Sequence, residues 1–342
     1  MWDRFLRACR RQPVDATPVW FMRQAGRYMA EYRAIREKHT LLEICRIPDL
    51  ATEVTLQPVR AMPVDAAILF ADILLPLEPM GAPFEFAKGE GPVFQAPVRT
   101  KAAIDALRVI EPREDLAHVM QAVKQIRGEL DGKTPLIGFA GAPFTLASYL
   151  VEGGKSTNYA VAKRMMYNEP ALWEQLMQKL SAVVREYLVA QVEAGAQAVQ
   201  LFDSWIGALA PNDYADYVLP HVKHVLDGVK DLGVPVIHFG TGTATLLELQ
   251  KQAGGSVIGI DWRVPLDQAH ARLGDDVALQ GNLDPICLYA EDEVLTRRVV
   301  EVVQKGRTAP GHIFNLGHGI LPDMSPDRIR FVADLVHEKS QR

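Results

Sequence analysis

The sequence predicts an α/β protein: a single (β/α)8 TIM-type barrel with an N-terminal helical extension and loop insertions. From about residue 64 onward, short apolar runs alternate with polar turns and amphipathic segments, as expected for parallel strands joined by helical crossovers. The 342 residues are many for one domain but fit a barrel with insertions. No linker or composition shift divides the chain, so we expect one domain over 1–342, with the extension in 1–60 and the barrel in 61–342.

Seven stretches are predicted to be strands because each is rich in β-branched or aromatic residues and too short for a helix. An eighth strand is ambiguous, and the candidates are 18–22 and part of 84–98. The stretch 84–94 is better interpreted as a hairpin within a loop insertion. A doubly wound open sheet is the alternative architecture. The seven predicted strands are 64–70, 135–140, 196–202, 234–239, 257–261, 278–282 and 312–317.

Helix boundaries between these strands are indicated by proline, glycine and capping residues. Pro170 and Pro265 are expected in first turns, where a missing N–H does no harm. Ser325, directly before a proline, is expected to be an N-cap, and Asp284 has the same position before Pro285. The pair Gly254-Gly255 is expected to end the helix before it.

The composition excludes several classes of protein. With 48% hydrophobic and 23% charged residues, long disorder is not expected. The three scattered cysteines form no disulfide framework, which favours a reducing compartment. No apolar run reaches the roughly 18 residues that a membrane span needs, and the first residues lack a signal-peptide core. We therefore expect a cytoplasmic protein that does not enter a membrane.

Positive charge is concentrated at the start of the chain. Residues 1–36 contain eight arginines and three acidic residues, so this segment carries +5 and the remainder −10. Nucleic-acid binding does not fit a pI of about 6.0 and the absence of a recognised motif. Arg23 and Arg27 lie in an apolar and aromatic context, which favours bidentate recognition of carboxylate or phosphate. The helically spaced arginines are expected on a solvated helix face: Arg4, Arg7, Arg10 and Arg11.

Asp72 stands between two apolar runs, 64–71 and 73–76, and is expected to be buried. Burying an unpaired carboxylate costs several kcal/mol, so it needs a partner. No Lys or Arg lies within ten residues on either side. The partner must come from elsewhere in the fold or from a ligand. The alternative is a structural carboxylate that caps the next helix or pairs with a core arginine.

Polar residues recur where the other predicted strands end, and these ends meet at one face of a barrel. Two motifs there imitate phosphate-binding loops. Residues 239–245, with Asp261 about 20 residues on, imitate a dinucleotide-binding fingerprint, but Thr245 occupies the third glycine position. Residues 154–156 end like a P-loop, but Tyr149 replaces its first glycine. His and Cys show no zinc-ligand spacing, so no metal is expected.

Five segments, in order along nearly the whole chain, resemble those of the uroporphyrinogen decarboxylase family. The two longest, PVWFMRQAGRY and GAPFTLASYLVEGG, are similar to the signatures of that family. The five segments are 18–28, 70–74, 141–154, 200–204 and 315–319.

The resemblance implies a (β/α)8 barrel, usually a homodimer, that acts without metal or organic cofactor in haem and chlorophyll biosynthesis. It implies that uroporphyrinogen III becomes coproporphyrinogen III as four acetate side chains lose CO2. The ionised carboxylate of Asp72 would accept hydrogen bonds from the four pyrrole N–H groups of the substrate. Arg23 and Arg27 would clamp substrate carboxylates, and Tyr149 would bond Asp72. The resemblance also assigns these residues to the substrate: Gln24, Ala25, Gly26, Phe202, Ser204 and His318.

Two rival functions remain at this point. Cobalamin-dependent methyltransferases resemble the same fold but use a thiolate-bearing zinc site with a His-x-Cys element. Here the corresponding strand end reads His238-Phe239-Gly240, without the cysteine. A tetrapyrrole carrier without turnover is the non-enzyme rival. The joint presence of four residues argues against it: Asp72, Arg23, Arg27 and Tyr149. The sequence leaves the proton donor unassigned.

Overall fold

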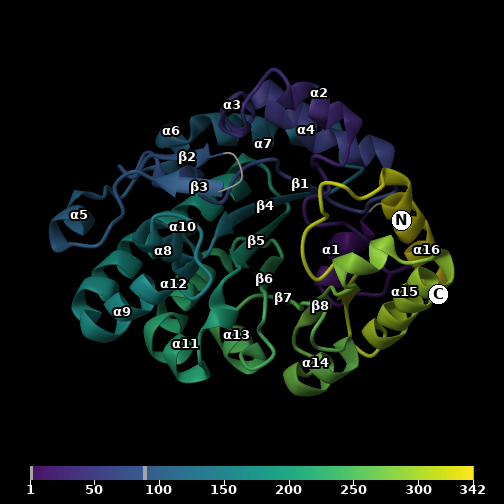
Figure 1. The fold of residues 1–342 in the computed structure, drawn as a ribbon. Coiled ribbons are helices and arrows are strands. Elements are labelled where there is room, and N and C mark those ends of the chain that lie inside the picture. The colour runs from purple at the N-terminus through teal and green to yellow at the C-terminus, as the bar shows by residue number, and fades with distance from the viewer. Residues whose placement is uncertain (1–2, 88–90, 342) are drawn as a thin grey trace.

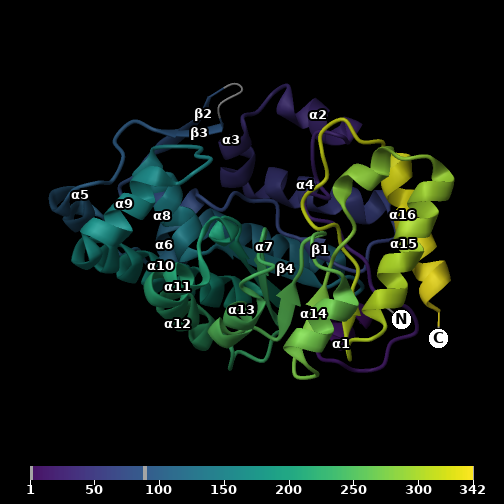
Figure 2. The same cartoon turned by 60° about the horizontal axis from the view of Figure 1, so that its bottom comes forward.

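The computed structural model describes residues 3–87 and 91–341. Its main sheet is a curled layer of seven parallel strands, surrounded by helices (Figures 1 and 2). The strand order follows the chain without reversal, unlike the order of a doubly wound sheet. In order they are β1 (Ala67–Ile68), β4 (Leu136–Gly141), β5 (Ala198–Asp203), β6 (Val236–Gly240), β7 (Val257–Gly259), β8 (Ala278–Gln280) and β9 (His312–Ile313).

All seven predicted strands are confirmed, and most are shorter than predicted. β1 and β9 have two residues each, and beyond Ile313 the chain continues through isolated bridges at Phe314 and Leu316. β4 and β5 are the longest, with six residues each, and β4 is buried at every position, as expected for a parallel strand covered on both faces. Residues 84–94 form the predicted hairpin, outside the main sheet. It consists of β2 (Phe84–Ala87) and β3 (Gly91–Phe94), and its residues 88–90 lie outside the described part of the chain.

Residues 18–20 lie between the first and last strands of the sheet. On one side, Val19 bridges Phe314 in parallel, and the Phe314 amide donates to the Pro18 carbonyl at 2.8 Å. On the other side, the Asp65 amide donates to the Val19 carbonyl at 2.7 Å. The two ends of the sheet are therefore joined through this segment. Of the two candidates for an eighth strand, 18–22 is the one that contacts the main sheet.

Sixteen helices accompany the strands in the described part of the chain. Four of them precede β1, as the predicted extension requires. The helices are α1 (Arg4–Cys9), α2 (Ala30–Arg36), α3 (Leu41–Arg46), α4 (Pro48–Ala61), α5 (Lys101–Ala106), α6 (Pro112–Asp115), α7 (Ala117–Leu130), α8 (Pro143–Glu152), α9 (Ala160–Asn168), α10 (Pro170–Ala194), α11 (Pro211–Tyr217), α12 (Leu219–Val229), α13 (Leu247–Ala253), α14 (Leu266–Leu273), α15 (Asp292–Gly306) and α16 (Pro326–Ser340).

Most predicted helix boundaries are confirmed. Pro170 begins α10, Gly254 follows the last residue of α13, and Ser325 is the N-cap of α16. The side chain of Asp284 accepts from the Ile286 amide, so it caps a short 3₁₀ helix. The prediction for Pro265 was wrong by one residue. It is the N-cap of α14, because its ψ of 139° is extended and the helix begins at Leu266.

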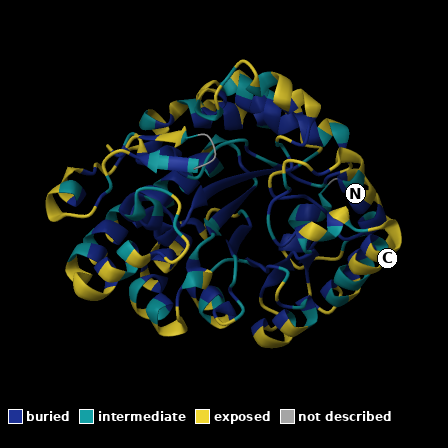
Figure 3. Ribbon diagram, in the orientation of Figure 1, coloured by how far each residue is buried: buried dark blue, intermediate teal, exposed yellow. Residues whose placement is uncertain are grey.

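The N-terminal ends of the strands are closed by α1. Its residues Phe5, Ala8 and Cys9 join the buried cluster formed by inward side chains of the strands, such as Ile237 and Ile313. The approach is close, because a Cβ on Gly311, just before β9, would lie 2.2 Å from the Ala8 carbonyl oxygen. Figure 3 shows the strands buried and the exposed residues on the outer faces of the helices. The C-terminal ends of the strands are thereby left as the open end.

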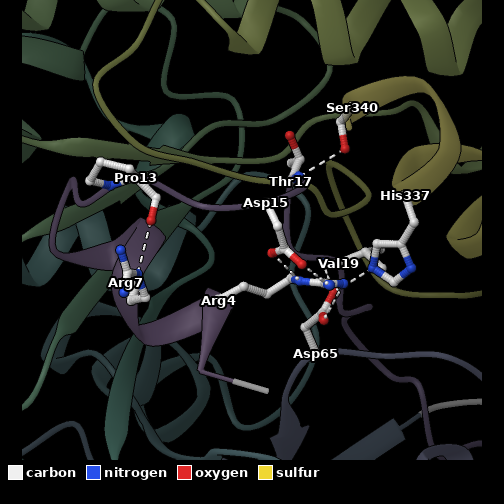
Figure 4. A network of polar contacts seen from close by, with 9 residues as sticks. All are labelled: Arg4, Arg7, Pro13, Asp15, Thr17, Val19, Asp65, His337 and Ser340. Carbon is white, nitrogen blue, oxygen red and sulfur yellow. Dashed lines mark hydrogen bonds and ion pairs between the residues drawn. The ribbon is translucent and has the colours of Figure 1, made fainter. Parts of the chain in front are cut away.

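Both termini are tied to this closed end by polar contacts around Asp65 (Figure 4). One carboxylate oxygen of Asp65 accepts from the Val19 amide at 2.8 Å and lies 2.7 Å from His337 Nε2 of α16. The other oxygen lies 3.2 Å from Arg4 of α1, whose guanidinium also bonds Asp15 at 2.7 Å. One largely buried carboxylate therefore links α1, α16 and the segment that joins the sheet ends.

Asp65→Ala should destabilise the fold by about 2–3 kcal/mol, because it leaves a buried amide and part of a guanidinium unsatisfied. The measurement is urea unfolding followed by circular dichroism. Asp231→Asn, on an exposed turn, is the charge-matched control and should change the free energy of unfolding by less than about 0.5 kcal/mol. Equal midpoints for the two variants would contradict the role of Asp65.

Candidate active site

Most of the predicted site residues follow the C-terminal ends of different strands. Asp72 comes after β1, Tyr149 lies on α8 after β4, and Ser204 follows β5. His318 comes after β9, and Arg23 follows the segment that bridges β9. Because the strands are parallel, these ends meet at the same edge of the sheet, the end that α1 leaves open. Residues from distant parts of the sequence are thereby brought together at this end of the sheet, which we call the mouth.

Asp72 is partly buried, and its carboxylate is only half satisfied by the protein. Oδ1 accepts from the Leu74 amide at 2.8 Å. Within the described residues, Oδ2 has no hydrogen-bond partner. Burial raises the pKa of Asp72 to about 6, although the Leu74 amide and the nearby Arg23 guanidinium both oppose that rise. Asp72 is not the cap of the next helix, because the 3₁₀ helix Leu75–Leu77 has Leu74 as its N-cap and no side-chain cap bond. One oxygen thus makes a local turn contact, and the second is available to a ligand.

Arg23 reaches the mouth from a tight turn. Its φ is +62°, in the left-handed region that side chains other than glycine rarely adopt. Its side chain runs across Gly319, because a Cβ at that position would lie 2.4 Å from Arg23 Cδ. The turn is held from below, since the Met22 amide donates to Asn315 Oδ1 at 3.0 Å. The guanidinium is therefore placed beside His318 by fixed backbone.

The side chain of Gln24 is not available to a ligand, because it is buried and hydrogen-bonded within the protein. It is fully buried, its amide nitrogen donates to the Ala66 carbonyl at 3.1 Å, and its oxygen accepts from the Phe21 amide at 3.2 Å. It therefore holds the turn that carries Arg23. Ala25 and Gly26 are half-buried, and Arg27 is exposed and close enough to lower the pKa of Arg23.

Tyr149 lies near Asp72 and Arg23, and its ring packs beside that of Trp205. Burial and the neighbouring Asp72 raise the pKa of Tyr149 to about 12, which keeps the phenol protonated. The expected Tyr149–Asp72 hydrogen bond is absent among the described residues. Tyr149 instead packs against Trp205, and the centres of their rings lie 6.1 Å apart. Trp205 is not among the site residues predicted from the sequence. Its position directly after Ser204, at the end of β5, could have indicated it.

His318 is neutral at physiological pH. Burial and the Arg23 guanidinium lower its pKa to about 4. Its Nδ1 accepts from the Gly319 amide at 2.6 Å, so the proton of the neutral ring resides on Nε2. His318 therefore offers one hydrogen-bond donor and no charge.

Phe202 provides an apolar surface at the end of β5. Its ring packs edge-on against Phe139 at 5.4 Å and Phe239 at 5.9 Å. Ser204 follows, with its carbonyl accepting from Thr241 Oγ1 at 2.6 Å. Both residues are half-buried, and the Ser204 hydroxyl makes no hydrogen bond to the described residues.

Several other polar residues at the strand ends serve the fold. Asp261 accepts from the Gly242 amide at 2.5 Å, so the acidic residue of the apparent dinucleotide fingerprint binds its own glycine loop. Gly154 of the apparent P-loop pairs with Val93 of the hairpin. His238 is fully buried, 3.3 Å from Asp203. No group of three or more potential metal ligands occurs among residues 3–87 and 91–341.

Asp72→Asn should make the protein more stable at pH 7, by about 1–2 kcal/mol. The pKa of Asp72 is about 6 in the folded protein against an ordinary 3.8, so the folded state binds the proton more tightly. Stability therefore falls as pH rises from about 4 to 6, and Asn removes this loss. Chemical denaturation of both proteins at pH 4 and pH 7 measures it. A difference that is the same at both pH values would contradict the assignment.

Comparison with known proteins identifies the family of this chain. Residues 2–339 match the family described as Uroporphyrinogen decarboxylase (URO-D). Proteins named uroporphyrinogen decarboxylase are 64% identical in Sorangium cellulosum, covering 98% of this chain and 96% of that protein, and 56% identical in Carboxydothermus hydrogenoformans, covering 99% and 97%. A solved methyltransferase from Methanosarcina mazei shares the fold, with a TM-score of 0.80 at 18% identity over 98% of this chain and 97% of that one. This chain belongs to the uroporphyrinogen decarboxylase family.

Proposed function

We propose that this chain decarboxylates the four acetate side chains of uroporphyrinogen III and releases coproporphyrinogen III, without a cofactor, in haem and chlorophyll biosynthesis. The observation that carries the proposal is Asp72. It is a carboxylate of raised pKa at the mouth, with one oxygen unpartnered among the described residues. Four pyrrole N–H groups converge at the centre of the substrate ring and supply the donors that this oxygen lacks.

We propose the following roles for the residues at the mouth. Asp72, Arg23 and Tyr149 are proposed as catalytic. Arg23 and Arg27 bind carboxylates, His318 donates from Nε2 to a propionate, and Phe202 supports the macrocycle with its apolar face. Gln24 acts by holding the turn. The proposed substrate-binding set is Arg23, Gln24, Ala25, Gly26, Arg27, Asp72, Tyr149, Phe202, Ser204 and His318.

The chemistry requires an electron sink, and the substrate supplies it. Protonation of a pyrrole ring carbon gives a cation, which the Asp72 carboxylate stabilises. The C–C bond to the carboxylate then breaks, CO2 leaves, and the bonding pair neutralises the ring. A proton adds to the resulting exocyclic methylene to give a methyl group, and the ring carbon loses its extra proton. The net change for each acetate is uptake of one proton and loss of one CO2.

We also propose a closed (β/α)8 barrel that is one domain over 1–342. The hydrogen bonds on both sides of Val19 support closure by the 18–22 segment. That segment belongs to the extension 1–60, so extension and barrel 61–342 are proposed to fold as one unit. A homodimer in the cytoplasm, without nucleic acid, is proposed from family membership. No helix of the described chain is long and apolar enough to span a membrane.

The methyltransferase alternative has the shared fold in its favour. Its metal-binding strand end corresponds to His238, which here bonds Asp203 and the Gln250 carbonyl inside the protein, at 3.3 and 3.2 Å. The next residues, Phe239 and Gly240, add no ligand. The arginines at the mouth have no use in that reaction, whereas they suit a substrate with eight carboxylates.

Chelator-treated protein should convert uroporphyrinogen III, under anaerobic reducing conditions, stepwise from eight to four carboxyl groups. The measurement is chromatography of the oxidised products by carboxyl number. An unchanged octacarboxylate from folded protein would overturn the proposal. Binding without CO2 release would favour a carrier, and a zinc content near one per chain would favour the methyltransferase.

Asp72→Asn should lower kcat at least about 100-fold while the fold is retained, because the ring cation loses its carboxylate. For the unchanged protein, kcat/KM should rise with pH through about 6 as Asp72 ionises, and the variant should lack this limb. Turnover of the variant at the wild-type rate would refute the role of Asp72.

Arg23→Ala should weaken substrate binding or turnover by about 10- to 100-fold, and Arg23→Lys should not fully restore it, because the planar fork is lost. Steady-state kinetics with uroporphyrinogen III measures both variants. Full activity of the lysine variant would show that a point charge suffices.

A further inference from the structure

Arg263 is an additional cation at the mouth that none of the assignments above includes. It lies four residues beyond the end of β7, at the same edge of the sheet as His318 after β9. Half of its side-chain surface is exposed. Its neighbours hold it in place more firmly than is usual for an exposed arginine.

Two contacts fix the Arg263 side chain, and a third fixes its backbone. Its Nη1 lies 2.5 Å from Asp261 Oδ2, and its backbone amide donates to Asp261 Oδ1 at 2.9 Å. The Asp261 carboxylate is 1% exposed and also accepts from the Gly242 amide, so it is itself immobile. The guanidinium carbon lies 4.1 Å from the centre of the Trp262 ring, in stacking contact.

The remaining donors of Arg263 are unused. Within the described residues, only Nη1 of the guanidinium donates a hydrogen bond. Nε and Nη2 present the planar pair of N–H groups that matches a carboxylate. A pre-positioned guanidinium loses little side-chain entropy on binding, which favours it as a recognition group.

The segment 317–319 connects Arg263 to the substrate site. A Cβ on Gly317 would lie 2.5 Å from the Trp262 amide nitrogen, and one on Gly319 would lie 2.4 Å from Arg23 Cδ. His318 therefore stands between Trp262 on one side and Arg23 on the other. Both Arg23 and Arg263 contribute to the lowered pKa of His318.

We infer that Arg263 binds a propionate carboxylate of the substrate, on the side of His318 away from Arg23. The inference rests on the proposed function and extends it. Propionates are retained through all four decarboxylations, so this contact holds the octacarboxylate substrate, every intermediate and the tetracarboxylate product alike. Arg263 is thus a substrate-binding residue and takes no part in the chemical step.

A purely structural reading of the same contacts makes a different prediction. If Arg263 only neutralises the buried Asp261, its loss lowers stability and leaves KM unchanged. If it binds a propionate, its loss raises KM with little change in kcat, because the contact is equal in the ground and transition states. Kinetics and stability measured on the same variant separate the two.

The experiment compares Arg263→Gln and Arg263→Lys with the unchanged protein. Arg298→Gln is the matched control, since Arg298 is an exposed arginine of α15 paired with Glu301. Arg263→Gln should raise KM for uroporphyrinogen III about tenfold, with kcat within about twofold. It should weaken inhibition by coproporphyrinogen III by a similar factor. The KM and product inhibition of Arg263→Lys should lie between those of Arg263→Gln and the unchanged protein. The control Arg298→Gln should match the unchanged protein in both.

Unchanged KM and product inhibition in folded Arg263→Gln would overturn the inference. An effect on the octacarboxylate alone would assign the contact to an acetate and also overturn it, because the product lacks acetates. If Arg263→Gln unfolds, Arg263→Lys decides by the same two measurements. Turnover by the unchanged protein reports on the proposed function separately. Were that absent, equilibrium dialysis of coproporphyrinogen III against both proteins would still test Arg263.

Discussion

The pairing of Asp65 with Val19 is the constraint on which fold and site both depend. The Asp65 amide donates to the Val19 carbonyl, and its carboxylate accepts from the Val19 amide. The same carboxylate binds Arg4 and His337, so the start of the chain, its end and the first strand meet at one group. Four residues after Val19 comes Arg23. The contact that joins the sheet ends thereby also sets where this guanidinium stands in the mouth.

Local patterns predict much of this fold, and contacts between distant residues account for what they miss. The seven strands are visible in sequence because a strand buried on both faces is a short apolar run. Residues 18–20 stay ambiguous in the sequence, because their place beside the sheet depends on a bridge to Phe314 and a hydrogen bond from Asp65. Asp72 stands out as a charge in an apolar run. The burial of Gln24 cannot be recognised from the sequence, since its partner Ala66 is 42 residues away. The Tyr149–Trp205 contact likewise depends on how α8 meets the end of β5.

The mouth combines groups whose charges are set by their surroundings. Asp72 is held at a raised pKa by burial, and His318 is kept neutral by burial and by a nearby arginine. Permanent charge is left to arginines, which stay protonated at any physiological pH. Such an arrangement is less stable than one with every carboxylate paired, as expected where binding groups wait for a ligand. The buried Asp72 lowers the free energy of unfolding, and well-paired groups elsewhere, such as Asp65, raise it.

The position of α1 has a further consequence for how substrate enters and how CO2 leaves. Phe5, Ala8 and Cys9 fill the end of the strand ring beneath the site, and the chain at Gly311 touches the backbone of this helix. With that end filled, we expect substrate and CO2 to pass at the opposite end, where the strands have their C-terminal ends. With the proposed substrate seated on Asp72, each CO2 released beneath the macrocycle would have to pass around its edge. If Asp72 serves all four acetates, the ring must be presented in four orientations, by turning in place or by leaving and rebinding.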